Sequence, residues 1–315
     1  MTSFASLFRL AARTAADGRR VAFCVVVRTQ GSAPQVPGAA MLLHDDMSTE
    51  GTLGGGCVEA EVRTRAFELL QRGQSGLLTF DLDRDYGWDD GLICGGTMDV
   101  AVAPIRGAEG AKPFVEAAEM LERCTSASLP INVEHEGRTR RFRLHVEAPA
   151  KLIIAGAGHV GAEVARLAVG LDFETTVIDD RADFANVRQL PPPIRPVVGD
   201  IAETLRGLPI DANTYVVVVT RGHKHDEQAL RAVIDRPERY LGMIGSRRKV
   251  KLILDDLAAL GVSRERLAQV HAPIGLSIGA VTVPEIAVSI VAELIQVRRT
   301  EKPTHVEEEE GSRCT

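Results

Sequence analysis

The chain has 315 residues, and its 37 Lys and Arg against 43 Asp and Glu leave a net charge of −6 at pH 7. This acidic balance argues against a general nucleic-acid-binding protein, so no nucleic-acid partner is expected. Apolar residues make up 45% and charged residues 25%, which is typical of a folded globular chain, and the length is sufficient for two domains.

The first twenty residues are polar and charged throughout, without the apolar segment of a secretory signal peptide. No uncharged run reaches the length that crosses a membrane, so no membrane partner is expected. The five cysteines show neither CxxC spacing nor a disulfide pattern. We therefore expect a cytoplasmic protein with reduced thiols.

Residues 1–147 are expected to form a mixed α/β domain. Apolar residues at helical spacing predict a first helix over residues 3–18. Apolar and β-branched runs predict strands over residues 21–29, 39–44, 77–81 and 98–105. Cys24, inside the first of these strands, is interpreted as a packing residue.

A hairpin is predicted around Glu136-Gly137, between strands near residues 131–133 and 141–146. The basic run Arg138-Thr-Arg-Arg141 at its second strand is interpreted as a solvated edge that discourages further strand pairing. An interdomain linker follows over residues 147–150.

The segment Gly51-Thr-Leu-Gly-Gly-Gly-Cys-Val-Glu59 leads into a helix predicted over residues 58–72. Cys57 stands at the start of this helix, where free N–H groups stabilise a thiolate. It is either a reactive thiol or soft-metal ligand in a glycine-walled cavity, or an inert cysteine at a helix start that needs glycine. Cys94, beside Gly95-Gly96, is a second cysteine that could meet Cys57 in space.

From Lys151 strands alternate with helices, which predicts a Rossmann-like, doubly wound parallel sheet over residues 151–300. Its first strand runs into Gly156-Ala-Gly-His-Val-Gly161, and a helix follows. Gly156 permits the tight turn, Gly158 lets the backbone approach a phosphate, and Gly161 lets the helix pack close to the strand. The alternative is a glycine-rich turn that binds no ligand.

The positions around this loop extend the predicted binding site. His159 opens the helix that follows the loop. The second strand ends in Asp179, eighteen residues after Gly161, at the place of the ribose-binding acid in dinucleotide-binding folds. These residues therefore join the glycines as candidate cofactor-binding residues.

The first and fourth strands of such a sheet end at the switch point where ligands bind. The fourth strand is followed by Thr220-Arg-Gly-His-Lys-His-Asp226, which places Arg221 and His223 at that point. His223, His225 and Asp226 suggest a metal cluster as an alternative. Zinc sites use wider spacing, so an anion-facing or hydrogen-bonding loop is favoured.

After the fifth strand, Ser246 can cap the next helix, and Arg247 and Arg248 make its start a second phosphate-binding candidate. A last helix is predicted from residue 282 to about 299, with an apolar stripe that serves a core or a homodimer contact. Residues 301–315 form an acidic tail that we expect to be disordered.

Taken together, these motifs resemble the xanthine dehydrogenase accessory proteins of the XdhC/CoxF family. The residues that carry the resemblance are, in chain order, Arg28-Thr-Gln-Gly-Ser-Ala-Pro34, Gly51-Thr-Leu-Gly-Gly-Gly-Cys-Val-Glu59, Cys94-Gly-Gly96, Gly156-Ala-Gly-His-Val-Gly161, Asp179-Asp-Arg181, Thr220-Arg-Gly-His-Lys-His-Asp226, Gly242-Met-Ile-Gly-Ser-Arg-Arg-Lys249, Pro273-Ile-Gly-Leu276 and Ile286-Ala-Val-Ser-Ile290.

The resemblance implies a chaperone for the molybdenum cofactor (Mo-molybdopterin) rather than an enzyme. Such a protein binds the cofactor, shields it from oxidation and supports its sulfuration by presenting it to a cysteine desulfurase. It then delivers the cofactor to the molybdenum-carrying subunit of xanthine dehydrogenase. A molybdopterin nucleotidyltransferase is a further implied partner.

The candidate residues agree with this chemistry. The cofactor's phosphate suits the loop over residues 156–161 or the helix start at Ser246, and its pterin can hydrogen-bond an acid such as Asp179. Cys57 is the first candidate ligand of molybdenum and Cys94 the second, because thiolates suit soft metals.

Two other functions compete. An NAD(P)-dependent oxidoreductase uses the same nucleotide fold and Asp179, but it lacks a clear acid/base pair here and leaves the glycine–cysteine motifs unexplained. The third interpretation is a structural subunit of the dehydrogenase itself.

Overall fold

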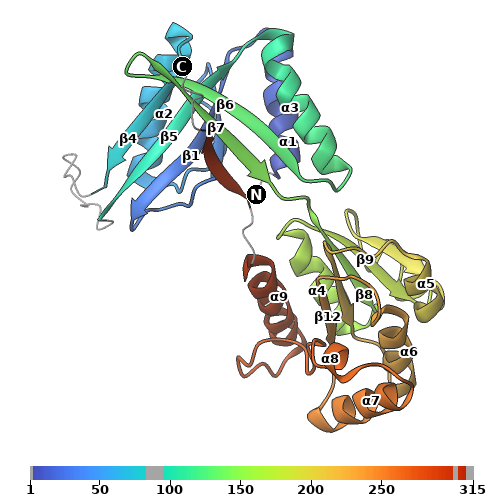
Figure 1. Cartoon of the computed structure of the whole chain (residues 1–315). Helices are drawn as coiled ribbons and strands as arrows, with labels where there is room; N and C mark the ends of the chain where they lie inside the picture. Colours follow the sequence, from blue (N-terminus) through green and yellow to red (C-terminus); the bar gives the residue numbers. More distant parts are fainter. Residues whose placement is uncertain (1–2, 83–94, 301–303, 310–315) are drawn as a thin grey trace, which may run out of the picture. The chain divides into compact units, whose positions relative to one another are not determined.

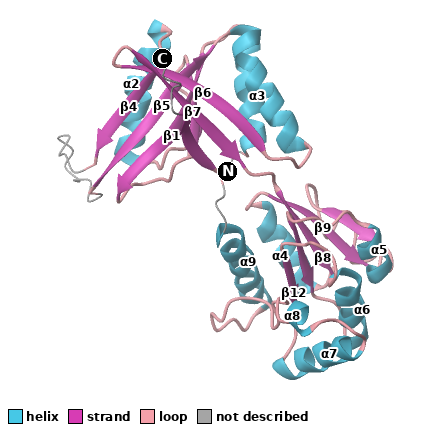
Figure 2. Cartoon of the chain, in the orientation of Figure 1, coloured by secondary structure: helices cyan, strands magenta, loops and turns pink. Residues whose placement is uncertain are grey.

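The computed structural model describes residues 3–82, 95–300 and 304–309, except the side chain of Cys57, and divides the chain into two compact units (Figures 1 and 2). The first unit comprises Met1–Ala148 together with Lys302–Thr315. The second comprises Pro149–Glu301. Among the described helices, none combines the length and the apolar character that crossing a membrane requires.

The first unit is built on a five-stranded antiparallel sheet in the order β3-β2-β1-β5-β4. Its strands are β1 (Val21–Gly31), β2 (Ala40–His44), β3 (Thr49–Gly51), β4 (Gly76–Asp81) and β5 (Gly96–Ile105).

The central strand β1 is buried on both faces, because helices cover both sides of the sheet. One face of β1 packs with α1 (Phe4–Ala16) and α3 (Gly107–Glu122), and the other packs with α2 (Gly56–Arg72). Cys24 lies on the α2 side, where burial raises the pKa of its thiol to about 12. Cys24 is therefore a packing residue, as its position in a buried strand predicts.

A second, three-stranded antiparallel sheet joins β6 (Ala127–His135), β7 (Arg138–Val146) and β13 (His305–Glu309). The predicted hairpin is confirmed: Glu136 and Gly137 both have positive φ, which matches the tight turn that suits a right-twisted strand pair.

The interpretation of β7 as a free edge is wrong, because β13 pairs along it and leaves it in the middle of the sheet. The expectation of a disordered tail also differs from the structure over residues 305–309. Guanidinium groups of the basic strand hold the acidic one: Arg140 pairs with Glu308, and Arg143 pairs with Glu309.

The second unit contains a five-stranded parallel sheet in the order β10-β9-β8-β11-β12. The strands are β8 (Ala150–Ala155), β9 (Phe173–Asp179), β10 (Arg195–Val198), β11 (Thr214–Val218) and β12 (Tyr240–Met243). The predicted doubly wound topology is confirmed, since β8 and β11 are neighbours and the order reverses between them.

Helices cover both faces of this sheet (Figure 1). One face carries α4 (His159–Val169) and α9 (Val283–Thr300). The other carries α5 (Ile201–Gly207), α6 (His223–Val233), α7 (Arg247–Ala259) and the short α8 (Arg264–Leu267). The apolar stripe of α9 thus serves the core, while the homodimer stays a prediction.

Two glycines allow the backbone of the turn between β8 and α4 to pack closely against neighbouring backbone atoms. Gly156 has φ +117°, and a Cβ there would lie 2.5 Å from the carbonyl oxygen of Val219. A Cβ on Gly161 would lie 1.9 Å from the carbonyl oxygen of Gly156. The helix can therefore approach the strand end only because position 161 has no side chain.

We expect Gly161→Ala to lower the midpoint of urea unfolding of the second unit, because overpacking of a close contact costs about 1–3 kcal/mol. Gly170→Ala is the matched control, since its Cβ would meet only the Leu167 carbonyl oxygen at 3.6 Å. Equal midpoints for the two variants would contradict the close-approach argument.

Candidate functional site

A hollow of about 420 Å³ lies where β8 and β11 end, at the switch point of the parallel sheet. The glycine loop forms one wall, and charged and apolar side chains from the ends of the neighbouring strands form the rest. Its lining includes Gly156, Gly158, His159, Asp179, Arg181, Phe184, Arg221, His225 and Ile244.

The N-terminus of α4 opens onto this hollow without a capping side chain. Gly158 is the N-cap residue, and a Cβ placed on it would meet no atom within 4 Å. The N–H groups of the first helical turn are free to bind an acceptor, and the helix dipole favours a negative charge. This end of the sheet is therefore suited to a phosphate or a comparable anion.

Asp179 is buried at the end of β9, with only 2% of its surface exposed. Its Oδ2 accepts hydrogen bonds from Ala157 N–H at 2.8 Å and from the Arg181 guanidinium at 2.9 Å. Its Oδ1 accepts from Arg181 Nε at 2.8 Å and from the Arg181 backbone N–H at 3.1 Å. Both carboxylate oxygens are thus occupied by groups of the protein.

These contacts determine the charge of Asp179. Burial alone raises the pKa of the carboxyl, but the hydrogen bonds from Arg181 and Ala157 outweigh it and lower the pKa to about 2. The guanidinium of Arg181 in turn lies 3.8 Å from the centre of the Phe184 ring. The guanidinium is therefore both paired and stacked, and a ligand here meets a guanidinium as well as a carboxylate.

The charged side chains that follow β11, over residues 220–226, contact different partners. Arg221, half-exposed, donates to Asp180 Oδ2 at 2.7 Å, and both line the hollow. The imidazole of His223 instead lies 3.4 Å from Asp256 on α7 and does not line the hollow, whereas His225 does.

Asp226 is fully buried at the start of α6. Thr220 Oγ1 donates a hydrogen bond to its Oδ1 at 2.6 Å, and the ammonium of Lys249 pairs with its Oδ2. This carboxylate ties the switch-point loop to α7. His223 faces Asp256, His225 lines the hollow and Asp226 pairs with Lys249, so these three side chains do not form the metal cluster considered as an alternative.

A second hollow, of about 660 Å³, adjoins the first through Ile244, which lines both. Ser246, Arg247 and the loop over residues 273–280 line it. Ser246 caps α7 by accepting from Lys249 N–H at 3.3 Å. Arg248 lines neither hollow, so the predicted pair of arginines is split, with Arg247 inside the site and Arg248 outside.

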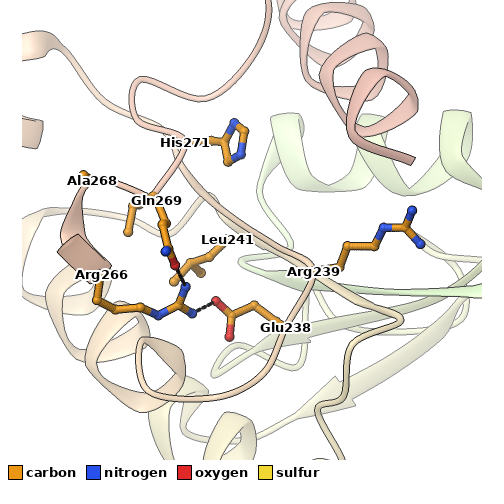
Figure 3. Close-up of a pocket in the computed structure, with 8 residues that line it drawn as sticks. Glu238, Arg239, Leu241, Arg266, Ala268, Gln269 and His271 are labelled. Carbon is orange, nitrogen blue, oxygen red and sulfur yellow. Dashed lines mark hydrogen bonds and ion pairs between the residues drawn. The ribbon is translucent and has the colours of Figure 1, made fainter. Parts of the chain in front are cut away.

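A third hollow, of about 370 Å³, lies beside the residues that precede β12, at the amino ends of the strands (Figure 3). The guanidinium of Arg266 pairs there with Glu238 and donates to Gln269 Oε1 at 2.6 Å. Burial raises the pKa of Glu238, and Arg266 opposes that effect. Parallel sheets bind ligands at their carboxyl ends, so we interpret this cluster as a structural clamp.

In the first unit, the glycine-rich turn before α2 is fixed by Glu59. Its Oε2 accepts hydrogen bonds from Thr52 Oγ1 at 2.7 Å, Leu53 N–H at 2.8 Å and Gly55 N–H at 3.0 Å. Cys57 is the second residue of α2, as predicted for a helix start, but its side chain lies outside the described residues. Cys94 also lies outside them, so a meeting of the two cysteines stays a prediction.

Arg181 and Phe184 line the hollow but are not among the site residues predicted from the sequence. Arg181 carries a recognisable signal, because it stands two residues after Asp179 at the end of a strand. Phe184 carries none, since nothing local indicates that its ring receives the guanidinium.

Comparison with known proteins matches both units. A family model described as XdhC Rossmann domain matches residues 152–294, and one described as XdhC and CoxI family matches residues 14–81.

Three relatives illustrate the similarity. YqeB from Escherichia coli is 29% identical over 95% of this chain, which spans only 49% of YqeB. The molybdenum cofactor insertion chaperone PaoD from Escherichia coli is 24% identical and matches 93% of this chain and 88% of its own. The crystal structure of a xanthine dehydrogenase from Bacillus halodurans superimposes with a TM-score of 0.81 at 25% identity, covering 95% of this chain and 97% of that one.

The low pKa of Asp179 predicts a specific loss of stability in acid. Its carboxyl binds a proton less readily in the folded than in the unfolded chain, where the pKa is 3.8, so its contribution is present above that pH and lost as the pH falls toward 2. Between pH 6 and pH 3, the wild type should lose about 1 kcal/mol more unfolding free energy than Asp179→Asn. Hydrogen exchange of the β8 amides measures this difference, and parallel pH profiles would refute it.

Proposed function

Because the chain belongs to the XdhC and CoxI family and its second unit contains the XdhC Rossmann domain, we propose that it is a molybdenum-cofactor chaperone. It binds Mo-molybdopterin as cargo, protects it and inserts it into a molybdoenzyme. The name of PaoD, a molybdenum cofactor insertion chaperone, supports this role.

The observation that carries the proposal is the uncapped N-terminus of α4, which lies at the switch point in the same hollow as Arg181 and Arg221. The cofactor has a phosphate, a polar pterin and a dithiolene-bound metal. The phosphate suits the free N–H groups at Gly158, or Arg247 in the adjoining hollow. Apolar side chains such as Phe184 and Ile244 offer a surface for the flat pterin.

The carboxylates at the site are paired with arginines, which suits a protein that binds a ligand without reacting with it. Asp179 is engaged by Arg181 and Asp180 by Arg221, so neither carboxylate is presented as a free base. The same contacts weigh against a direct hydrogen bond from Asp179 to a pterin, as predicted from the sequence, or to the ribose of the rival NAD(P)-dependent oxidoreductase, because either ligand would have to displace Arg181. No turnover is required of a protein that binds and releases its cargo.

The partners proposed for this chaperone are those that the cargo needs. A cysteine desulfurase supplies the sulfur for the terminal sulfido ligand, and the molybdenum-carrying subunit of xanthine dehydrogenase receives the cofactor. A molybdopterin nucleotidyltransferase competes for the same cofactor or hands it over. Cys57 is proposed as the thiolate that approaches molybdenum, with Cys94 as the second candidate.

The direct test is to purify the chain from a host that makes molybdopterin and to assay bound molybdenum, pterin and nicotinamide together. We expect molybdenum and pterin without nicotinamide. Gly158→Leu should fold normally, because its Cβ points into open space, yet lose at least about tenfold in bound cofactor, since the side chain fills the hollow. Nicotinamide as the sole bound group would overturn the chaperone proposal.

The two arginines at the start of α7 provide a matched pair of variants. Arg247→Ala should weaken cofactor binding about tenfold, the effect of losing one charge-assisted hydrogen bond. Arg248→Ala should leave the affinity unchanged, because Arg248 lines neither hollow. Equal losses in titrations with the isolated cofactor would place the phosphate elsewhere.

Cys57→Ala tests the proposed thiolate. We expect the variant to retain the pterin but to bind molybdenum less tightly, because a ligand atom is removed. Unchanged molybdenum content and unchanged sulfuration of the cofactor would exclude Cys57 as a ligand, and Cys124→Ala serves as the control cysteine.

A further inference from the structure

The first unit carries two histidines and a glutamate on one face of its smaller sheet. His305 on β13 lies directly opposite His145 on β7. Glu307 follows two residues after His305 and therefore points to the same face. The juxtaposition joins the end of the chain to a strand more than 150 residues earlier in the sequence.

The three side chains lie close together, and a shared ion would require the two rings to turn out of their present stack. The imidazole rings of His145 and His305 stack with their centres 4.8 Å apart and their planes at 17°. Nε2 of His145 lies 3.4 Å from Glu307 Oε2, and Nε2 of His305 lies 3.4 Å from Glu307 Oε1. One ligand atom from each residue lies within 4.8 Å of the other two.

The separation of each imidazole nitrogen from the nearer oxygen of Glu307 is close to the spacing of two ligand atoms around a tetrahedral metal ion. Two ligand atoms that each lie about 2.05 Å from a tetrahedral zinc ion are about 3.3 Å from one another. Both observed N···O separations are close to this value. The contact between His305 Nε2 and Glu307 Oε1 also counts as a hydrogen bond, a long one at 3.4 Å.

Two neighbouring arginines pair with glutamates other than Glu307. Arg140 pairs with Glu308 and Arg143 with Glu309, so these two guanidinium groups of β7 are directed to the other two glutamates of β13. Glu307 faces the histidines. Nε2 of His145 is inaccessible to solvent and has no hydrogen-bond partner within the part of the chain that the structure describes.

We propose that His145, His305 and Glu307 bind a divalent transition-metal ion of the zinc type, with water as the fourth ligand. Two imidazoles and a carboxylate are a borderline donor set that zinc accepts. The ion fastens β13 to β7. Since the chain leaves the first unit after Ala148 and returns to it with β13, the ion secures the second of the two covalent connections between the units.

This site is separate from the proposed cofactor cargo, because none of its three ligands is among the residues proposed to hold the cofactor. Its test therefore uses the full-length chain without cargo. The untagged protein is stripped with a chelator and titrated with Zn²⁺ by calorimetry and with Co²⁺ by visible absorption. We expect one equivalent of each metal, cobalt bands of a tetrahedral site and slower hydrogen exchange of the β13 amides.

His305→Ala should lower the affinity for zinc at least about tenfold, and Glu307→Gln should do the same while keeping the side-chain shape and the strand pairing. His135→Ala is the matched control, because this histidine lies on β6 outside the cluster. Absence of binding by the wild type, or equal affinity in the wild type and Glu307→Gln, would overturn the proposal.

Discussion

The buried carboxylate of Asp179 connects the parts on which the site of the second unit depends. It accepts hydrogen bonds from the glycine loop through Ala157 N–H and from Arg181 through both backbone and side chain. A buried charge is stable only when its oxygens are paired in this way. The pairing orients the loop after β8 and the end of β9 together, and it leaves the N-terminus of α4 open toward the hollow.

A second buried carboxylate has the same role on the other side of the switch point. Asp226 joins the loop after β11 to α7 through Thr220 and Lys249. Asp179 thus joins the ends of β8 and β9, and Asp226 joins the loop after β11 to the helix after β12. The two hollows that adjoin at Ile244 lie at this end of the sheet. The amino ends carry a separate clamp in which Arg266 holds Glu238.

The first unit shows a different use of charge. There the acidic end of the chain lies along a basic strand, and ion pairs join β13 to β7 across the sheet. Exposed ion pairs of this kind are individually weak, about 0–1 kcal/mol each, so the main-chain ladder and Val306 against the core must contribute as well. Residues 305–309, which the sequence predicts to be a disordered acidic tail, form a strand because the basic strand β7 pairs with them.

The sequence by itself determined what local pattern controls. Apolar periodicity predicted most strands and helices, and the glycine spacing after residue 155 predicted the turn, the open helix start and the doubly wound sheet, because these depend on neighbouring residues and on the handedness of βαβ units. Only the tertiary structure decided that Arg181 covers Asp179, that Asp226 turns to Lys249 and that residues 305–309 pair with β7. The last two outcomes depend on groups that stand 23 to 168 residues apart and meet only after the chain has folded, so no local period encodes them. Arg181 stands only two residues from Asp179, but the direction of its side chain is set by its contacts with Asp179 and Phe184 in the folded unit.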